Sequence, residues 1–189
     1  MCVAIVAPYP DEEKKEVHKP LSLEILKACE KSNPAGGGIA HVTDNGVYFK
    51  KGLTSEEIFE IQKTLEPPYF IHFRIPTTGG ADKRLCHPFP ISKKASLALE
   101  GTCQAALMHN GHWGGWKTGL LNLLQGPMPP APWSDTRAMA YVAAHFTTEI
   151  LTLVDEKVAV LYKDGGYRFF VRGWELAEGH WFSYMNWKH

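Results

Sequence analysis

Residues 38–65, GIAHVTDNGVYFKKGLTSEEIFEIQKTL, place a hairpin directly before a helix. Residues 38–50 predict two paired strands, because the central Asn45-Gly46 readily supplies the positive φ angles that tight hairpin turns require. Thr54-Ser55-Glu56-Glu57 then matches a capping box, and the apolar residues after it recur at helical spacing until Pro67. This stretch therefore predicts an antiparallel strand pair with a helix as its neighbour.

Short strands and helices also alternate in the rest of the chain. Apolar runs bounded by proline or glycine predict the strands, and Ser22 and Ser134 are the expected N-caps of two further helices. The expected elements are strands over Cys2–Ala7, Tyr69–Phe73 and Ala105–Met108, a second hairpin of Val158–Tyr162 with Tyr167–Arg172, and helices over Ser22–Lys31 and from Asp135 past Tyr141. Hairpins without repeated βαβ units favour an α+β fold with mostly antiparallel sheets.

The composition is that of an ordinary globular protein. The 189 residues suffice for one domain with a hydrophobic core and are too few for two full catalytic domains, so we expect a single domain over residues 1–189. Lys plus Arg (20) equals Asp plus Glu (20), and no long basic run offers the charge that attracts nucleic acid. No apolar stretch reaches the roughly 18 residues that span a bilayer. We therefore expect a soluble, cytoplasmic protein with a small-molecule substrate, and no nucleic-acid or membrane partner.

The cysteines are interpreted as thiols, because the chain shows no export signal of the kind that accompanies a disulfide framework. They are Cys2, Cys29, Cys86 and Cys103, and none forms a C-x-x-C pair. A zinc site requires clustered thiolates or imidazoles, and neither Cys86-His87 nor His109 with His112 has a convincing second half. We expect no metal and no cofactor.

Cys2 becomes the first residue if Met1 is removed, and methionine aminopeptidase removes Met1 when the next residue is small. A thiol and a free α-amino group would then share one residue. The α-amino pKa is about 7.7–8.0 and the thiol pKa about 8.5, so the amine can accept the thiol proton close to neutral pH. The alternative is that Cys2 is an inert buried cysteine that serves as a small apolar residue.

Three polar groups follow an expected strand or begin an expected helix. Arg74 follows Tyr69–Phe73 and suits a substrate carboxylate, or is a surface arginine. Asn110-Gly111 offers an amide donor and an unhindered backbone N–H for an oxyanion, or is a plain turn. Asp135 binds an ammonium group or compensates the dipole at a helix start. With Cys2, these groups form a complete set for hydrolysing an amide on an amino-acid substrate.

Short motifs surround these residues in a fixed order along most of the chain. They are Met1-Cys2, Asn33-Pro34-Ala35-Gly36-Gly37-Gly38, His72-Phe73-Arg74-Ile75-Pro76-Thr77-Thr78-Gly79, Cys86-His87-Pro88-Phe89, His109-Asn110-Gly111 and Ser134-Asp135-Thr136. In their order and spacing they resemble the class II glutamine amidotransferases, a family of N-terminal-nucleophile hydrolases. The compact size resembles the small stand-alone members of that class.

The resemblance implies a fold and a set of catalytic residues. The fold would be a four-layer αββα sandwich, in which two mostly antiparallel sheets face each other and Cys2 begins a central strand. Cys2 would be the nucleophile, and Asn110 with the backbone of Gly111 would form the oxyanion hole.

The resemblance also implies how the substrate is held. Arg74 and Thr77 would bind its α-carboxylate, and Asp135 its α-ammonium group. His87 matches a structural histidine beside the site. Thr78 would support the site, although the family often has histidine at this position, and the chain is glycine-richer around Gly36–Gly38 than the large synthases.

Three functional hypotheses remain open at this point. In the first, the thiol of Cys2 attacks the side-chain amide of glutamine, and ammonia leaves from a γ-glutamyl thioester and escapes or passes to a synthase partner. In the second, the same machinery hydrolyses another γ-glutamyl or peptide-like amide. In the third, the chain is a non-catalytic binding protein on the same scaffold.

Overall fold

The computed structural model describes residues 2–10, 17–76, 80–124 and 128–188, and within these ranges the strands form two antiparallel sheets, one of seven strands and one of four. The larger sheet has the order β10-β11-β1-β4-β2-β3-β6, and the smaller has the order β5-β7-β8-β9. The strands are β1 Val3–Ala7, β2 Gly37–Thr43, β3 Gly46–Leu53, β4 Tyr69–Phe73, β5 Phe89–Pro90, β6 Glu100–Cys103, β7 Ala105–Asn110, β8 Lys157–Tyr162, β9 Tyr167–Phe169, β10 Glu175–Ala177 and β11 His180–Phe182. The chain is therefore α+β, as its hairpins predict.

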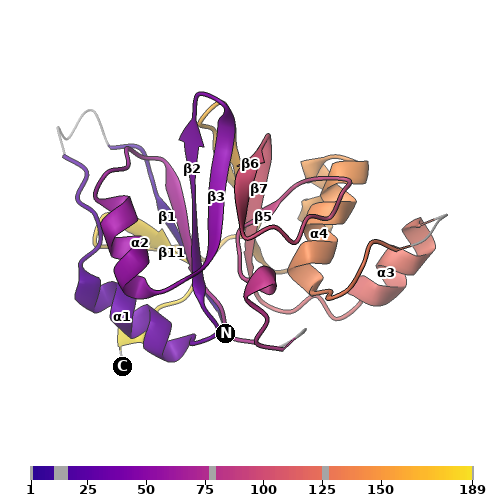
Figure 1. Cartoon of the computed structure of the whole chain (residues 1–189), viewed down its shortest axis with the longest axis horizontal. Coiled ribbons are helices and arrows are strands. Elements are labelled where there is room, and N and C mark those ends of the chain that lie inside the picture. Colours follow the sequence, from indigo (N-terminus) through magenta and orange to yellow (C-terminus); the bar gives the residue numbers. More distant parts are fainter. Residues whose placement is uncertain (1, 11–16, 77–79, 125–127, 189) are drawn as a thin grey trace.

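The helices lie on the outer faces of the two sheets (Figure 1). The α-helices are α1 Leu23–Ser32, α2 Ser55–Gln62, α3 Trp116–Leu123 and α4 Asp135–His145, and short 3-10 turns occur at η1 Lys83–Leu85, η2 Thr148–Leu153 and η3 Asn186–Lys188. The predicted N-caps are confirmed, because Ser22, Thr54 and Ser134 each accept a hydrogen bond from a backbone N–H of the following turn. Glu57 completes the capping box at Thr54.

Three apolar layers join the helices and sheets. One cluster, which includes Val3 and Leu26, lies between the larger sheet and helices α1 and α2. A second, which includes Ala4 and Met108, lies between the two sheets, and we call it the inter-sheet layer. A third, which includes Met139, joins the smaller sheet to α4. Helices, larger sheet, smaller sheet and helices thus succeed one another (Figure 1), which is consistent with the expected sandwich.

Some elements end at positions other than those expected. Helix α2 ends at Gln62 instead of continuing past Leu65, because both the backbone N–H and the hydroxyl of Thr64 bind the carbonyl of Ile61 and tighten the last turn. In the first hairpin turn only Gly46 has a positive φ, and Asn45 does not share it. Strand β7 does not end at Met108. It runs on to Asn110, because this residue and His109 pair with β8.

Several elements had no clear sequence signal, among them helix α3 and strands β10 and β11. Helix α3 begins after Gly115 without a side-chain cap. Strands β10 and β11 are three residues each and lie in the aromatic C-terminal region, where β11 pairs with β1. The second hairpin is shorter than expected, since β9 ends at Phe169 rather than Arg172.

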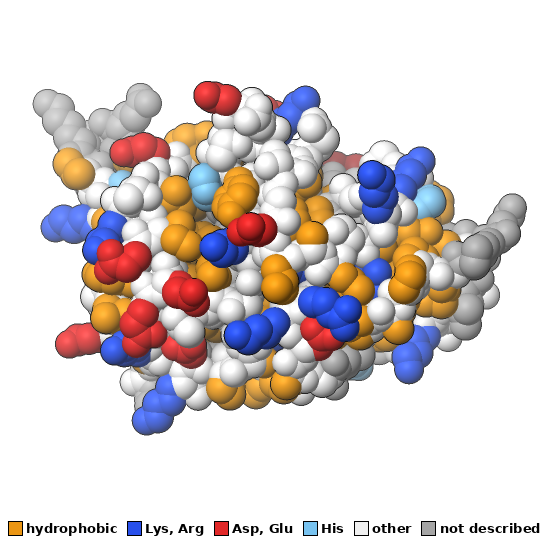
Figure 2. Space-filling model, in the orientation of Figure 1, with side chains coloured by type: hydrophobic (Ala, Val, Ile, Leu, Met, Phe, Trp, Pro, Cys, Tyr) orange, Lys and Arg blue, Asp and Glu red, His pale blue; other side chains and the backbone are white. Residues whose placement is uncertain are grey.

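The surface carries both signs of charge. Figure 2 shows basic and acidic side chains interspersed on the face that it presents, in keeping with the net charge of zero. Among the described helices, none combines the length and the apolar character needed to cross a membrane. That residues 1–189 form a single domain stays a prediction.

Candidate active site

Alternation along three strands brings three of the expected site residues to one space. Side chains two positions apart in a strand face the same way. The inter-sheet layer contains Ala4 and Val6 of β1, Phe70 of β4, and Ala106 and Met108 of β7. Continuing the same alternation, Cys2, Arg74 and Asn110 face this layer too. All three lie at the same end of the inter-sheet layer. Val3, next to Cys2, pairs with Phe73, next to Arg74. The hydroxyl of Ser183 accepts hydrogen bonds from both the Ala4 N–H and Asn110 Nδ2, and so joins β1 to the end of β7.

Cys2 lies immediately before β1 and is 8% exposed. Its Sγ accepts a hydrogen bond from the backbone N–H of Ile75 at 3.4 Å. Burial raises the pKa of the Cys2 thiol, while this hydrogen bond and the positive charge of Arg74 act in the opposite direction. The net shift is upward, so the thiol is protonated at neutral pH and needs a base before it can act as a nucleophile.

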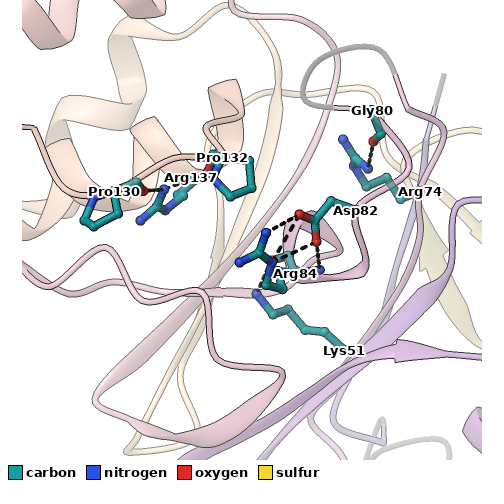
Figure 3. Close-up of polar contacts among 8 residues, drawn as sticks. All are labelled: Lys51, Arg74, Gly80, Asp82, Arg84, Pro130, Pro132 and Arg137. Carbon is teal, nitrogen blue, oxygen red and sulfur yellow. Dashed lines mark hydrogen bonds and ion pairs between the residues drawn. The ribbon is translucent and has the colours of Figure 1, made fainter.

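Arg74 follows β4 and is buried rather than a surface arginine, with 3% of its surface exposed. Its backbone continues the sheet pairing, since its N–H donates to Gly36 and its carbonyl accepts from Ala35. Nη1 donates to the carbonyl oxygen of Gly80 at 2.7 Å (Figure 3). A buried guanidinium beside the thiol of Cys2 is suited to holding an anionic group there.

Asn110 is the last residue of β7 and lies opposite Lys157 of β8. Its Nδ2 donates to Ser183 Oγ at 3.0 Å, and its Oδ1 is buried without a hydrogen-bond partner among the described residues. Gly111 follows with φ +145°, and a Cβ built there would lie 2.0 Å from Glu156 Oε2. The positive φ favours glycine here, and without a side chain the Gly111 N–H at the end of β7 is unhindered.

Asp135 is the first residue of α4 and is 5% exposed. One carboxylate oxygen accepts from the N–H of Thr136 at 2.9 Å, and the other accepts from the N–H of Trp113 at 3.1 Å. The carboxylate therefore stabilises the helix start, as one of the two sequence interpretations held. Asp135 also acts electrostatically on Cys2, because its negative charge raises the pKa of the Cys2 thiol.

His87 belongs to a buried group of histidines that also includes His72 and His109. The rings of His87 and His72 lie 3.9 Å apart between centroids, and His87 Nδ1 accepts from the His109 N–H at 3.4 Å. His72 Nε2 lies 3.1 Å from the His109 carbonyl oxygen. Burial lowers the pKa of His72 to about 3 and that of His109 to about 4, and it holds the pKa of His87 well below its ordinary value. All three imidazole rings are therefore neutral near pH 7. The contact of His72 in β4 with His109 in β7 joins the ends of these two strands.

Asp135 is connected to this histidine group. The Nδ1 of His109 lies 3.1 Å from Thr136 Oγ1, and Thr136 is the residue whose N–H binds the Asp135 carboxylate. The start of α4 is thereby fixed to the end of β7. The Asp135 carboxylate is therefore held in place by contacts within the fold.

Two expected site residues, Thr77 and Thr78, lie outside the described residues. Conversely, sequence reasoning missed Ser183, Trp113 and Ile75, which contact Asn110, Asp135 and Cys2 respectively. Two of these contacts use backbone N–H groups, which leave no mark in the sequence. The third joins residues 73 positions apart, so no local pattern could indicate it.

The charges around Cys2 have opposite signs on two different elements. Arg74 after β4 is positive, Asp135 in α4 is negative, and both act on the thiol. Such a pair is complementary to a ligand that carries a carboxylate and an ammonium group. No set of three His, Cys, Asp or Glu side chains converges as metal ligands would in the part of the chain that the structure describes. The cysteines, all of them within that part, are free thiols.

Comparison with known proteins adds no family assignment. No protein-family model matches the chain, and a search of the curated proteins finds no match.

Proposed function

We propose that the chain is an N-terminal-nucleophile amidohydrolase of the class II glutamine amidotransferase type, with the four-layer αββα sandwich of that superfamily. Its substrate is glutamine, and its nucleophile is the thiol of Cys2 after removal of Met1. The observation that carries the proposal is the grouping of a buried thiol, a buried guanidinium and a buried amide at one end of the inter-sheet layer, with a carboxylate acting on the same thiol.

The reaction begins with proton transfer within one residue. The free α-amine of Cys2 takes the thiol proton, and the thiolate attacks the side-chain amide carbon of glutamine. The oxyanion that forms is stabilised by N–H groups of Asn110 and Gly111. The proton then passes to the departing nitrogen, and the C–N bond breaks to leave ammonia and a γ-glutamyl thioester.

Water completes the cycle. It attacks the thioester carbon with the α-amine of Cys2 as base, and the C–S bond breaks to give glutamate and the free thiol. The sum is glutamine plus water to glutamate plus ammonia. Ammonia then escapes or passes to an acceptor on a synthase partner.

In the chain that still carries Met1, the pKa of the Cys2 thiol is raised, so the thiol needs a base, and removal of Met1 would supply an amine on the same residue. A thiol with a depressed pKa would attack as a preformed thiolate, whereas this one is protonated near neutral pH. No described histidine hydrogen-bonds Sγ, and the buried histidines are themselves too weakly basic to help. The amine on the same residue is the base that remains.

The proposal is tested by ammonia release from a matched substrate panel. L-Glutamine should be hydrolysed by the processed protein and not by Cys2→Ala. Glutamine analogues that lack the α-amino group or carry a methyl ester on the α-carboxylate should be poor substrates, because Asp135 and Arg74 would each lose a partner. Equal turnover of all three would instead favour an amidohydrolase for other amides. No Cys2-dependent turnover of any amide would favour the binding protein.

A further inference from the structure

Ser183 is a buried residue between the nucleophile strand and the proposed oxyanion donor. It is 0% exposed and follows β11. Its N–H donates to the Ala4 carbonyl at 2.8 Å, and its own carbonyl accepts from Lys157 Nζ at 2.6 Å. These two contacts hold Ser183 beside Ala4, which follows Cys2 by two residues.

The hydroxyl of Ser183 accepts two hydrogen bonds and donates none to a described residue. The N–H of Ala4 donates to Oγ at 2.9 Å, and Nδ2 of Asn110 donates to it at 3.0 Å. Among the described residues, the Ser183 O–H has no acceptor, and Asn110 Oδ1, a buried acceptor, has no donor. A hydroxyl carries one donor, so these two needs match each other.

A half-turn of the Asn110 amide about its Cβ–Cγ bond meets both needs. The two ends of an amide have nearly the same shape, so hydrogen bonds determine which end faces Ser183. After the turn, Oδ1 accepts from the Ser183 O–H, while Ser183 Oγ still accepts from the Ala4 N–H. The NH₂ group then takes the place of the buried, unpartnered oxygen.

We propose that Ser183 is the positioning residue that holds the Asn110 amide with its oxygen toward Ser183 and its NH₂ group toward the reacting carbonyl. This inference rests on the proposed function. An oxyanion is stabilised by N–H groups and repelled by a carbonyl oxygen, so the amide helps catalysis in only one of its two orientations. Ser183 selects that orientation because its proton then has an acceptor, whereas the opposite orientation leaves both this proton and Asn110 Oδ1 without a partner among the described residues.

A double-mutant cycle tests the dependence of Ser183 on Asn110. Ser183→Ala should lower kcat for glutamine by about 10-fold or more, up to the roughly 10² to 10³-fold lost with the donor itself, and change KM by less than about twofold. In the Asn110→Ala background the same substitution should have no further effect on kcat, because Ser183 acts through Asn110. An equal fall in both backgrounds, or no fall in either, would overturn the proposal.

Thr54→Ala serves as the stability control for this cycle. It removes a cap of α2 on the outer face of the larger sheet, so it should shift the unfolding midpoint without changing kcat. Ser183→Ala and Thr54→Ala are compared by unfolding midpoint and by kcat. If the two variants have the same midpoint and only Ser183→Ala loses kcat, lost stability does not explain that loss.

The orientation of the amide can be measured without any activity. In ¹⁵N-labelled protein, the side-chain NH₂ protons of Asn110 are identified by their loss in Asn110→Ala, and their nuclear Overhauser effect to the Ala4 amide proton is recorded. We expect a weak or absent effect, because the NH₂ group faces away from Ser183. A strong effect would overturn the proposed orientation. If glutamine is not hydrolysed at all, the proposed function fails, and this measurement alone decides the orientation.

Discussion

At the scale of single residues, the proposed function gives the buried side chains around Cys2 separate tasks. The contacts of Arg74 and Asp135 with a bound amino acid would exist in the ground state. Asn110 would act on a charge that exists only during the reaction. Substitutions at these positions should therefore differ in kind.

Asn110→Ala should lower kcat by about 10² to 10³-fold with little change in KM, because it removes an oxyanion donor. Arg74→Ala and Asp135→Ala should chiefly raise KM for glutamine, with a smaller loss in kcat from poorer positioning. Steady-state kinetics of the three variants measures this contrast. If Arg74→Ala and Asp135→Ala leave both constants unchanged, glutamine is not bound in the proposed way.

The sequence predicted the residues that strands deliver and missed those that only the fold brings near. Cys2, Arg74 and Asn110 stand at strand ends with matching alternation, so their grouping follows once the sheets face each other. Ser183 lies at the end of a three-residue strand that had no sequence signal, and its partner Asn110 is 73 positions away. Its role could be found only from the hydrogen bonds of the folded chain.

At the scale of elements, one arginine fixes the start of helix α4. The guanidinium of Arg137 donates to the carbonyl of Ala95 through Nε and Nη2. Its Nη1 donates to the carbonyls of Pro130 and Pro132 (Figure 3). It also lies over the ring of Trp133, 4.2 Å from the centroid. Two loops are thereby joined to the helix turn that carries Asp135 at its first position.

Arg137→Lys should lower the free energy of unfolding by about 2 kcal/mol, because an ammonium group cannot reproduce the planar set of donors and leaves buried carbonyls unpaired. It should also raise KM for glutamine by loosening the turn around Asp135. Urea unfolding and kinetics measure both effects. Arg168→Lys is the matched control, since the ion pair of Arg168 with Glu149 is exposed and worth little. Equal stability of the two variants would contradict this account of Arg137.

Elements with caps and tight turns could be predicted, and elements held by tertiary contacts could not. The helices that begin after Ser22, Thr54 and Ser134 carry their own start signals. Helix α3 has no side-chain cap and owes its place to packing against α4. The hairpin of β10 and β11 likewise depends on its pairing with β1.

At the scale of the whole molecule, buried neutral histidines connect stability to pH. Burial lowers the pKa of His72 to about 3 and the pKa values of His109 and His180 to about 4, compared with about 6.5 in an unfolded chain. Between these values the unfolded chain binds protons that the native protein does not. The contribution of these histidines to the free energy of unfolding is therefore fully present above about pH 6.5, and it is lost as the pH drops toward 4.

For each such histidine, the free energy of unfolding should fall by up to about 1.4 kcal/mol per pH unit as the pH drops through this window. The free energy of unfolding in urea should thus be clearly lower at pH 5.5 than at pH 7.5. His180→Gln removes one titrating group, and it should make the pH dependence shallower by about one proton. A stability that does not change between these two pH values would show that these histidines are not buried in their neutral form.

The role of Cys2 is tested most directly by peptide mapping of the purified protein after reaction with a diazo-ketone analogue of glutamine. We expect a chain without Met1 that carries one adduct, on the thiol of Cys2, and no adduct in Cys2→Ala. We also expect glutamine to protect Cys2 from the reagent. An adduct on Cys86 or Cys103 instead, or a chain that keeps Met1 and yet hydrolyses glutamine at full rate, would contradict this role of Cys2.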